Sequence, residues 1–387
     1  MTQFAELCDP ISEHCQPAES GATVYVGLEH IDGGAFRLSR HGSPAQVQSA
    51  KSRFRAGDLL YGKLRPYLDK AVLADRDGIC STDILVFRPR QKVCGAYLLG
   101  LIHSPEFLAH AVATTQGVNH PRTSWASVAE FEWNTPERPE QEKIAAVLWK
   151  VQRAIAAEDK LTATARDLKQ SAMRQLFTHG LRNEPHKETD IGPLPESWTR
   201  VPASEIFKLT SGSKRPADLS QVATPEKPFP ILGGNGVMGY STEWFLDTSE
   251  CLVIGRVGEY CGAVHVTRGK VWITDNALYA KEWLRDDIRV DYLAEFLDYY
   301  DLNRFKRMAG QPLVTQGLIN EHSFPIPSPA EQREIAGVLQ TIDRKISLHE
   351  RKRATLQELF ETLLHQLMTG QIRVHKLDID VSEIQTP

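Results

Sequence analysis

The chain has 387 residues, of which 41% are hydrophobic and 24% charged. This balance is typical of folded soluble domains, and the length suits two domains of ordinary size. No run of about 18 apolar residues occurs, which excludes a membrane-spanning helix. The net charge of −4 excludes a strongly basic nucleic-acid binder, so any contact with nucleic acid must come from local basic patches.

The cysteine pattern argues against a zinc cluster. The six cysteines include no C-x-x-C pair, and the first residues contain no apolar core of signal-peptide length. We therefore expect free thiols, no structural metal and a cytoplasmic protein.

Residues 1–136 predict a first globular domain. Short β-branched runs alternate with turns and are followed by a short helix from Ala96, which indicates a small mixed α/β fold. Basic, aromatic and amide side chains gather in two of its loops. The candidate DNA-binding residues there are Lys63, Arg65, Tyr67, Asn119, His120, Arg122 and Thr123.

Residues 137–180 predict a long helix. Pro139 suits its first turn, acidic residues follow where the helix dipole favours them, and Gly180 is a plausible stop. Apolar positions recur at alternating spacings of 4 and 3, which is typical of a coiled coil. This stripe comprises Ile144, Leu148, Val151, Ile155, Glu158, Thr162, Ala165, Lys169, Ala172 and Leu176, and Glu158 and Thr162 are its central polar interruptions.

Residues 181–198 are rich in Pro, Gly and charge and predict a linker. Residues 199–327 predict a second mixed α/β domain. Its Gly234–Gly239 segment fits a dinucleotide-loop pattern but runs into an extended segment, so a tight turn at the rim of a β-rich domain is the better interpretation. The candidate DNA-binding residues are Lys214, Arg215, Asn235, Tyr240, Arg256, Glu259, Tyr260, Gln311, Thr315 and Gln316.

Residues 328–371 predict a second long helix with the same stripe, and residues 372–387 predict a flexible tail. Glu140 and Gln141 match Glu331 and Gln332, which lie 191 positions further along the chain, and His349 and Arg353 are the polar interruptions of the second stripe. Two such helices in one chain most simply pack on each other, and the polar interruptions could fix their register. The alternative is that each helix covers the core of its own domain.

The repeat extends into the globular parts. Gly57–Tyr67 aligns with Ser249–Tyr260, and Ser81–Pro89 aligns with Ile273–Lys281. The same two loop regions are polar in both copies but carry different side chains, of the types that contact base edges and phosphates. That pattern favours two readers of different sequences on one scaffold, although a solvated loop surface would explain any single residue equally well.

Catalytic signatures are missing from the sequence. It has no phosphate loop, no H-E-x-x-H, and no Asn/Asp-Pro-Pro-Tyr/Phe tetrapeptide of the kind used by amino-methylating DNA enzymes. Asp58 with Lys63, or Asp83 with Lys92, can be forced into a nuclease-like pattern, but such pairs occur by chance in most proteins. We expect no catalytic residue and no metal ligand.

Several segments together resemble the specificity (S) subunit of type I restriction–modification systems. The resemblance rests on the segments from Gly57 to Pro89, from Phe229 to Tyr240 and from Leu252 to Val264, and on the repeated E-Q-x-x-I-A-x-V-L motif. It implies an α+β fold with two target-recognition domains and two long antiparallel coiled-coil helices related by an internal pseudo-two-fold repeat.

The same resemblance implies a non-catalytic subunit whose domains each read one half of a bipartite, asymmetric DNA target. It implies two modification (methyltransferase) subunits and restriction (translocase/nuclease) subunits as partners. S-adenosylmethionine, ATP and Mg²⁺ are then expected on those partners, with no cofactor on this chain. Two alternatives stay open: a stand-alone DNA methyltransferase or nuclease, and a repeat-built scaffold that meets no DNA.

Overall fold

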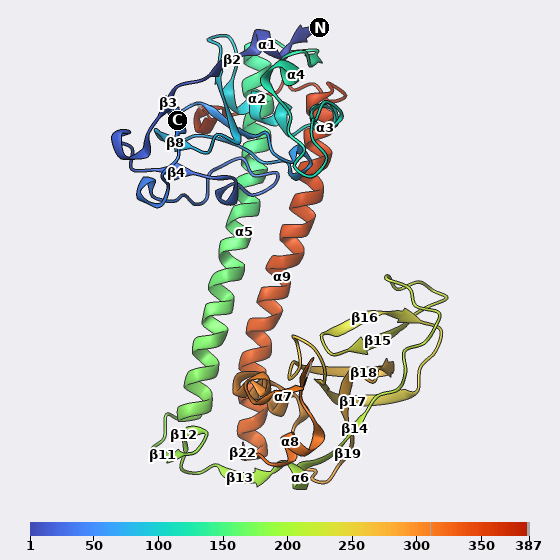
Figure 1. The fold of residues 1–387 in the computed structure, drawn as a ribbon. Helices are drawn as coiled ribbons and strands as arrows, with labels where there is room; N and C mark the ends of the chain where they lie inside the picture. Colours follow the sequence, from blue (N-terminus) through green and yellow to red (C-terminus); the bar gives the residue numbers. More distant parts are fainter. Residues whose placement is uncertain (310, 385–387) are drawn as a thin grey trace. The chain divides into compact units, whose positions relative to one another are not determined.

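A computed structural model describes residues 1–309 and 311–384. The chain divides into two compact units, one formed by Met1–Lys160 with His349–Pro387 and the other by Leu161–Leu348. Both long helices are present, as α5 (Arg138–His179) and α9 (Pro329–Met368). The division falls within both helices, so each unit holds one globular domain and a half of each helix (Figure 1).

The sheets of the first unit are short and separate. One four-stranded sheet has the order β2-β9-β6-β7 and another has the order β3-β5-β8-β4, in which only β4 and β8 are parallel. The strands are β2 (Cys8–Ile11), β3 (His14–Cys15), β4 (Tyr25–Val26), β5 (Lys51–Phe54), β6 (Leu59–Gly62), β7 (Ala71–Leu73), β8 (Gly78–Cys80) and β9 (Ile84–Pro89).

The second unit has the same strand order, but in one continuous sheet rather than two. Its six-stranded sheet runs β14-β19-β17-β18-β15-β16, and β15 and β18 form the parallel pair. Strand β17 takes the place of β5 and β6, and β18 that of β7 and β8. The strands are β14 (Phe207–Ser211), β15 (Phe229–Gly233), β16 (Gly236–Ser241), β17 (Leu246–Gly255), β18 (Val264–Ile273) and β19 (Ala277–Trp283).

A corner between β5 and β6 explains why the first domain has two sheets. Gly57 has a φ of +85°, and the Asp58 side chain is almost fully buried beside it. The Asp58 carboxylate accepts a hydrogen bond from the Arg55 main-chain N–H at 2.8 Å and is paired with Arg88 at 2.8 Å. In the second domain, the equivalent strand β17 continues through a bulge between Thr248 and Cys251.

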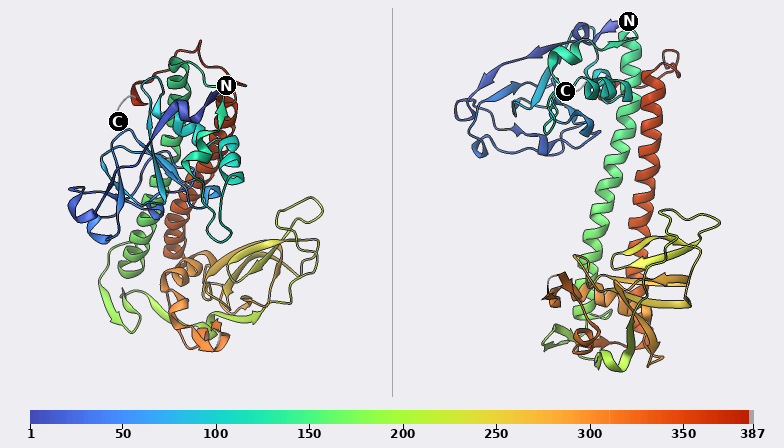
Figure 2. Two further views of the ribbon diagram at one scale, coloured as in Figure 1. Left: turned by 45° about the horizontal axis from the view of Figure 1, so that its top comes forward. Right: turned by 45° about the vertical axis from the view of Figure 1, so that its right-hand side comes forward.

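Within each unit, the segments of α5 and α9 run side by side in opposite chain directions (Figures 1 and 2). In the first unit, Ile144, Leu148 and Ile155 of α5 share a core with Phe360, Leu364 and Leu367 of α9. In the second, Met173, Leu176 and Phe177 share a core with Ile335, Ala336 and Leu339. The helices therefore pair antiparallel. In each unit, the paired helical segments also pack against the core of the globular domain.

The polar interruptions of the stripes meet as predicted, with one exchange of partner. His349 Nδ1 lies 2.5 Å from Glu158 Oε2 in the first unit. Arg353 is paired with Asp159 at 3.3 Å rather than with Thr162, which is buried. Because a slip of one turn would separate His349 from Glu158, this contact favours a single register.

The E-Q pair of the repeat motif ties each long helix to its own domain. Gln141 Oε1 accepts a hydrogen bond from the main-chain N–H of Cys94, just before α2 (Gly95–Ile102), at 2.9 Å. Gln332 Oε1 accepts from Arg289, just before α7 (Val290–Tyr300), at 2.7 Å. Both side chains are buried, and each amide nitrogen donates to a carbonyl of the preceding loop.

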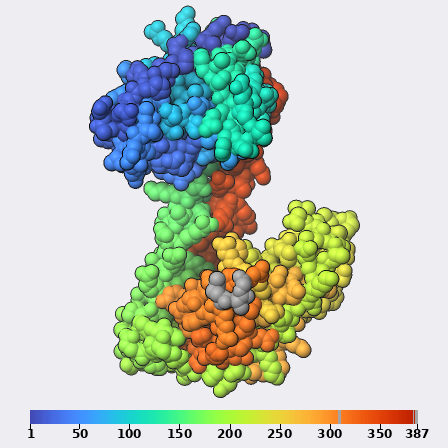
Figure 3. Space-filling model, in the orientation of Figure 1, coloured from blue at the N-terminus to red at the C-terminus, as the bar shows by residue number. Residues whose placement is uncertain are grey.

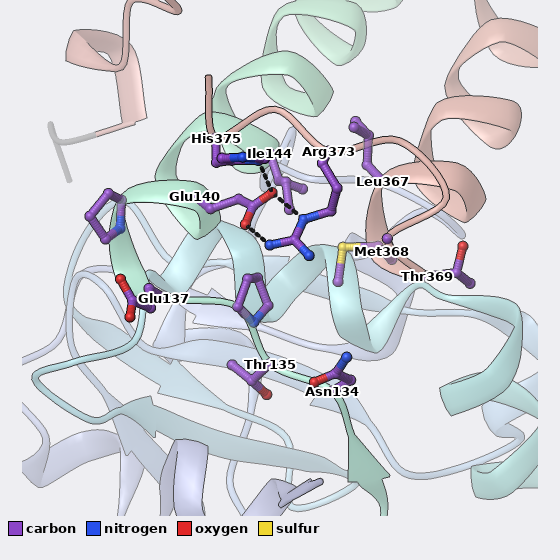
Figure 4. Close-up of a pocket in the computed structure, with 13 residues that line it drawn as sticks. Asn134, Thr135, Glu137, Glu140, Ile144, Leu367, Met368, Thr369, Arg373 and His375 are labelled. Carbon is purple, nitrogen blue, oxygen red and sulfur yellow. Dashed lines mark hydrogen bonds and ion pairs between the residues drawn. The ribbon is translucent and has the colours of Figure 1, made fainter. Parts of the chain in front are cut away.

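The predicted linker and tail are both more structured than their composition suggests. The linker forms the hairpin of β11 (His186–Thr189) and β12 (Gly192–Pro195), and Trp198 at its end is buried. In the tail, Val374 is buried and Arg373 donates two hydrogen bonds to Glu140, with His375 beside them (Figure 4). The buried Glu140 carboxylate thus contacts the side chains of Arg373 and His375, and the flexible tail stays a prediction.

The remaining elements of the two domains carry the loops that matter for function. In the first unit, α3 (Pro105–Ala113) and α4 (Trp125–Ala129) flank the loop of residues 114–124, and this teal segment lies at the surface in Figure 3. In the second unit, β20 (Arg307–Ala309), β21 (Gln311–Leu313) and α8 (Gln316–Asn320) lie in the corresponding part of the chain. Within the described residues, no helix is both long and apolar enough to cross a membrane.

Candidate DNA-reading surface

Two loops of the first domain are joined by main-chain hydrogen bonds. The reading turn, defined here as residues 63–69, follows β6, and the loop of residues 114–124 lies against it. Thr123 N–H donates to the Lys63 carbonyl at 3.0 Å, and Arg65 N–H donates to the Pro121 carbonyl at 2.8 Å. Leu64 and Arg122 also form a β-bridge. The structure therefore brings together the two regions of the first domain in which sequence reasoning placed candidates.

The reading turn of the first domain has a strained backbone. Arg65 and Asp69 have φ values of 52° and 50°, in the left-handed region that non-glycine residues rarely adopt. The turn presents Arg65 and Tyr67 to solvent, and Tyr67 is 54% exposed. Such strain is tolerated when the surroundings fix the turn, and it is common at functional sites.

The second domain repeats the arrangement around Arg256. Its reading turn, residues 256–262, follows β17. Val314 N–H donates to the Arg256 carbonyl at 2.9 Å, and Gly258 N–H donates to the Pro312 carbonyl at 3.0 Å. Val257 and Leu313 form a β-bridge, as Leu64 and Arg122 do in the first domain. The turn presents Glu259 and Tyr260 to solvent.

Further candidates of the second domain surround the same turn. Gly234 packs so closely on the main chain of Asn276 and Val257 that an added Cβ would lie 3.2 Å from the Asn276 carbonyl oxygen. Asn235, the next residue, lies in the tight turn between β15 and β16 that the glycine pattern predicted. Lys214 and Arg215 line a cavity of about 420 Å³ together with Met238, Thr274 and Asn276.

Two candidates do not fit a reading surface in this structure. Thr123 is 3% exposed, because its main chain bridges the two loops and its side chain faces inward. Tyr240 is half-buried and lies within β16, where it pairs with Ser220 and Pro230 away from the reading turn. Near the turns, the candidates Asn119, His120 and Gln311 are exposed, and Thr315 and Gln316 are half-buried. Thr315 caps α8 through its hydroxyl.

Sequence reasoning missed one position in each domain. Lys63 N–H donates to the Asp83 carbonyl at 3.0 Å, and Arg256 N–H donates to the Asn276 carbonyl at 2.8 Å. Asp83 and Asn276 are therefore equivalent. The sequence alignment of Ser81–Pro89 with Ile273–Lys281 instead pairs Asp83 with Asp275 and is out of register by one residue. Only the strand pairing, in which Gly62 faces Ile84 and Gly255 faces Ala277, reveals the slip.

The electrostatics of the first reading turn are dominated by cations around one carboxylate. Arg122 Nε lies 2.9 Å from Asp83 Oδ1, and its terminal nitrogen lies 3.3 Å from Oδ2. These hydrogen bonds, with the nearby charges of Arg122, Lys63 and His120, lower the pKa of Asp83. Within the described residues, no group of three or more His, Cys, Asp or Glu side chains is placed to hold a metal ion.

Comparisons with known proteins agree with this duplicated architecture. Residues 195–358 match the model of the type I restriction modification DNA specificity domain. The chain is 21% identical over 331 residues to the type I restriction enzyme MjaVIII specificity subunit of Methanocaldococcus jannaschii, covering 79% of this chain and 77% of that protein. The chain therefore resembles type I restriction enzyme specificity subunits over most of its length.

Other specificity subunits resemble part of the sequence or the whole fold. The EcoprrI specificity subunit of Escherichia coli is 30% identical over 145 residues, which cover 37% of this chain and 35% of that protein. The crystal structure of a type I restriction-modification S subunit from M. genitalium matches with a TM-score of 0.66 and 16% identity, covering 95% of each chain. The chain thus shares its fold of two domains and two long helices with that S subunit.

Proposed function

We propose that this specificity subunit selects the DNA sequence on which a type I restriction–modification complex acts. Each globular domain reads one half of a bipartite, asymmetric target, and the paired helices set the unread spacer between the halves. The observation that carries the proposal is the repeated pair of joined loops, which has the same main-chain hydrogen bonds in both domains but different side chains. A shared scaffold with different side chains is what two readers of different sequences require.

The chain performs no chemistry of its own in this proposal. Modification subunits, two per specificity subunit because the chain is internally two-fold, supply S-adenosylmethionine and methyl transfer. Restriction subunits supply ATP- and Mg²⁺-dependent translocation and cleavage. None of the relatives named above is described as a stand-alone methyltransferase or nuclease, and no observation favours that alternative.

The local charge distribution supports a DNA partner despite the net charge of −4. Lys63, Arg65, Arg122 and His120 gather on the loops of the first domain, and Lys214, Arg215 and Arg256 on those of the second. Local cations are what phosphate contacts need, because binding releases the counterions of DNA.

Methylome mapping tests the proposal. The chain is co-expressed with its modification subunits in a host that lacks adenine methylation at the target, and methylated adenines are mapped with and without the specificity gene. We expect a bipartite motif that appears only with the gene. In that complex, Arg65→Ala should relax one half of the motif and Arg256→Ala the other. A missing motif, or equal relaxation of both halves by each variant, would contradict the proposal.

A further inference from the structure

The equivalent residues Asp83 and Asn276 have different surroundings. Each precedes the strand next to its reading turn, β9 or β19, and each accepts the first main-chain hydrogen bond of that turn. Arg122 and Leu313 are likewise equivalent, because they form the matching bridges with Leu64 and Val257. The first domain thus has an Asp–Arg pair where the second has Asn and Leu.

In the first domain, Asp83 holds Arg122 in one orientation. Two N–H donors of the Arg122 guanidinium go to the Asp83 carboxylate, and Nη1 donates to the His120 carbonyl at 3.3 Å. A guanidinium has five N–H donors, so two remain. Two parallel N–H donors are what a bidentate contact with guanine O6 and N7 uses. The Arg122 side chain is 42% exposed, so it is accessible to DNA.

A carboxylate on a DNA-binding loop is unexpected, because the phosphates of DNA repel its negative charge. Asp83 lies among Lys63, His120 and Arg122, all of which suit contact with DNA. Its side chain is only 29% exposed and is directed at the guanidinium. Its role is therefore to position Arg122 rather than to contact DNA.

In the second domain, the same position carries an amide without such a partner. Asn276 is exposed, and within the described residues its side chain makes no hydrogen bond. It lines the cavity that also contains the Lys214 and Arg215 side chains. Thr274 Oγ1 lines the same cavity, is buried and has no hydrogen-bond partner within the described residues. An asparagine amide reads adenine by donating to N7 and accepting from the N6 amino group. The Asn276 amide has no other hydrogen bond within the described residues, so it is available for this contact.

We propose that this position determines which base each domain reads: Asp83 aims Arg122 at a guanine, and Asn276 reads an adenine directly. The proposal rests on the proposed function and adds the residues and bases to it. The exchange of Arg122 for Leu313 supports it, because the orienting carboxylate is absent in the domain that lacks the arginine.

The test uses the complete complex of this chain with its modification subunits, again with methylome mapping. Asp83→Asn and Arg122→Leu should each relax one G·C position in the half-site of the first domain, by about 5- to 150-fold in preference. The double variant should relax it no further than Arg122→Leu alone, because the carboxylate acts only through the guanidinium. Asn276→Ala should relax one A·T position in the other half-site.

Matched controls separate this inference from loss of fold. Asp75→Asn removes an exposed carboxylate that is paired with Arg76 in the same domain, and Asp247→Asn alters an exposed residue of β17; both should leave the motif unchanged. Thermal unfolding of each variant subunit should match that of the wild type. An unchanged motif in Asp83→Asn and Asn276→Ala, or additive effects in the double variant, would overturn the inference. A wild-type complex with no bipartite motif would instead overturn the proposed function.

Discussion

The two places where a long helix meets its domain use the same Glu-Gln pair in different ways. Gln141 and Gln332 share two contacts: each accepts from the residue before a shorter helix and donates to a carbonyl of the preceding loop. Glu140 pairs with Arg373 at 2.7 and 2.6 Å. Glu331 instead accepts from Leu181 N–H at 3.1 Å and from Trp198 Nε1 at 3.3 Å.

The difference shows what each residue of the motif does. The glutamine serves the fold within one copy, so its partners repeat. The glutamate holds whatever chain follows the other helix: the linker after Gly180 in the second unit, and the tail after Gly370 in the first. Both glycines have a positive φ, 67° and 75°, and turn the chain back toward the glutamate. The C-terminal tail thus takes the place in the first unit that the linker takes in the second.

Breaking the shared glutamine contact should give the largest effect. Gln332→Leu and Gln141→Leu each leave a buried main-chain N–H and carbonyl without a partner, at about 1–3 kcal/mol for each group. Gln332 makes an additional hydrogen bond to the Asp287 carbonyl at 3.0 Å, so its change should cost more. Urea unfolding of both variants measures which one loses more free energy of unfolding. Equal or negligible losses would contradict the assigned role of the glutamines.

A polar cluster in the second unit should make its stability depend on pH. Lys169 Nζ lies 2.8 Å from Asp343 and 3.0 Å from Glu295, whereas the equivalent of Lys169 in the first unit is the buried Phe360. Burial raises the pKa of Glu295 to about 7, against the lowering effect of Lys169. Partial desolvation also raises the pKa of the neighbouring Asp298, which is exposed at its outer edge.

The sign of this effect follows from the raised pKa. Protonated Glu295 is favoured in the folded state, so its contribution is complete below about pH 4.5 and is lost as the pH rises through about 7. Relative to the wild type, the free energy of unfolding of Glu295→Gln should rise as the pH goes from about 4.5 to about 7, by at most about 1.4 kcal/mol per pH unit. Urea unfolding across this range measures it, and a pH-independent difference between the two proteins would show that Glu295 is ionised throughout.

Releasing the tail should have a smaller effect, confined to the first unit. The hydrogen bonds from Arg373 lower the pKa of Glu140, so the pair stabilises the fold at neutral pH and loses its effect as the pH falls through that lowered pKa. Arg373→Ala should raise hydrogen exchange in residues 371–384 and at the start of α5, whereas Arg351→Ala, on the exposed face of α9, should not. An unchanged exchange pattern would contradict the role of Arg373 in holding the tail.

The smallest effect concerns a pair of cross-helix contacts in the first unit, His349 with Glu158 and Arg353 with Asp159. The His349 and Glu158 side chains are 20% and 15% exposed, and those of Arg353 and Asp159 are 46% and 58% exposed. Double-mutant cycles with alanine should give a coupling of about 1 kcal/mol for the first pair and below about 0.5 kcal/mol for the second. A reversed order would contradict the role of His349 and Glu158 in the helix register.

Local patterns in the sequence were enough to predict the two long helices. The features that were not predicted depend on contacts between residues far apart in the sequence. The 4,3 stripe, Pro139 and Gly180 are enough to predict α5, because a helix depends on nearby residues. Asp83 and Asn276 depend on strand register, and a one-residue slip hides their equivalence. The partner of Glu140 is Arg373, 233 positions away, and no local pattern predicts such a contact.

The proposed function requires that two readers of separate half-sites are held by a helical spacer. Its most direct test is the methylome of a complex in which four residues are inserted into both helices at the level of the contact between Glu158 and His349. Four residues lengthen each helix by about 6 Å, which is under two base-pair steps of DNA. We predict the same two half-sites with a spacer longer by one or two base pairs. An unchanged spacer in a methylating complex, or altered half-sites, would contradict the account.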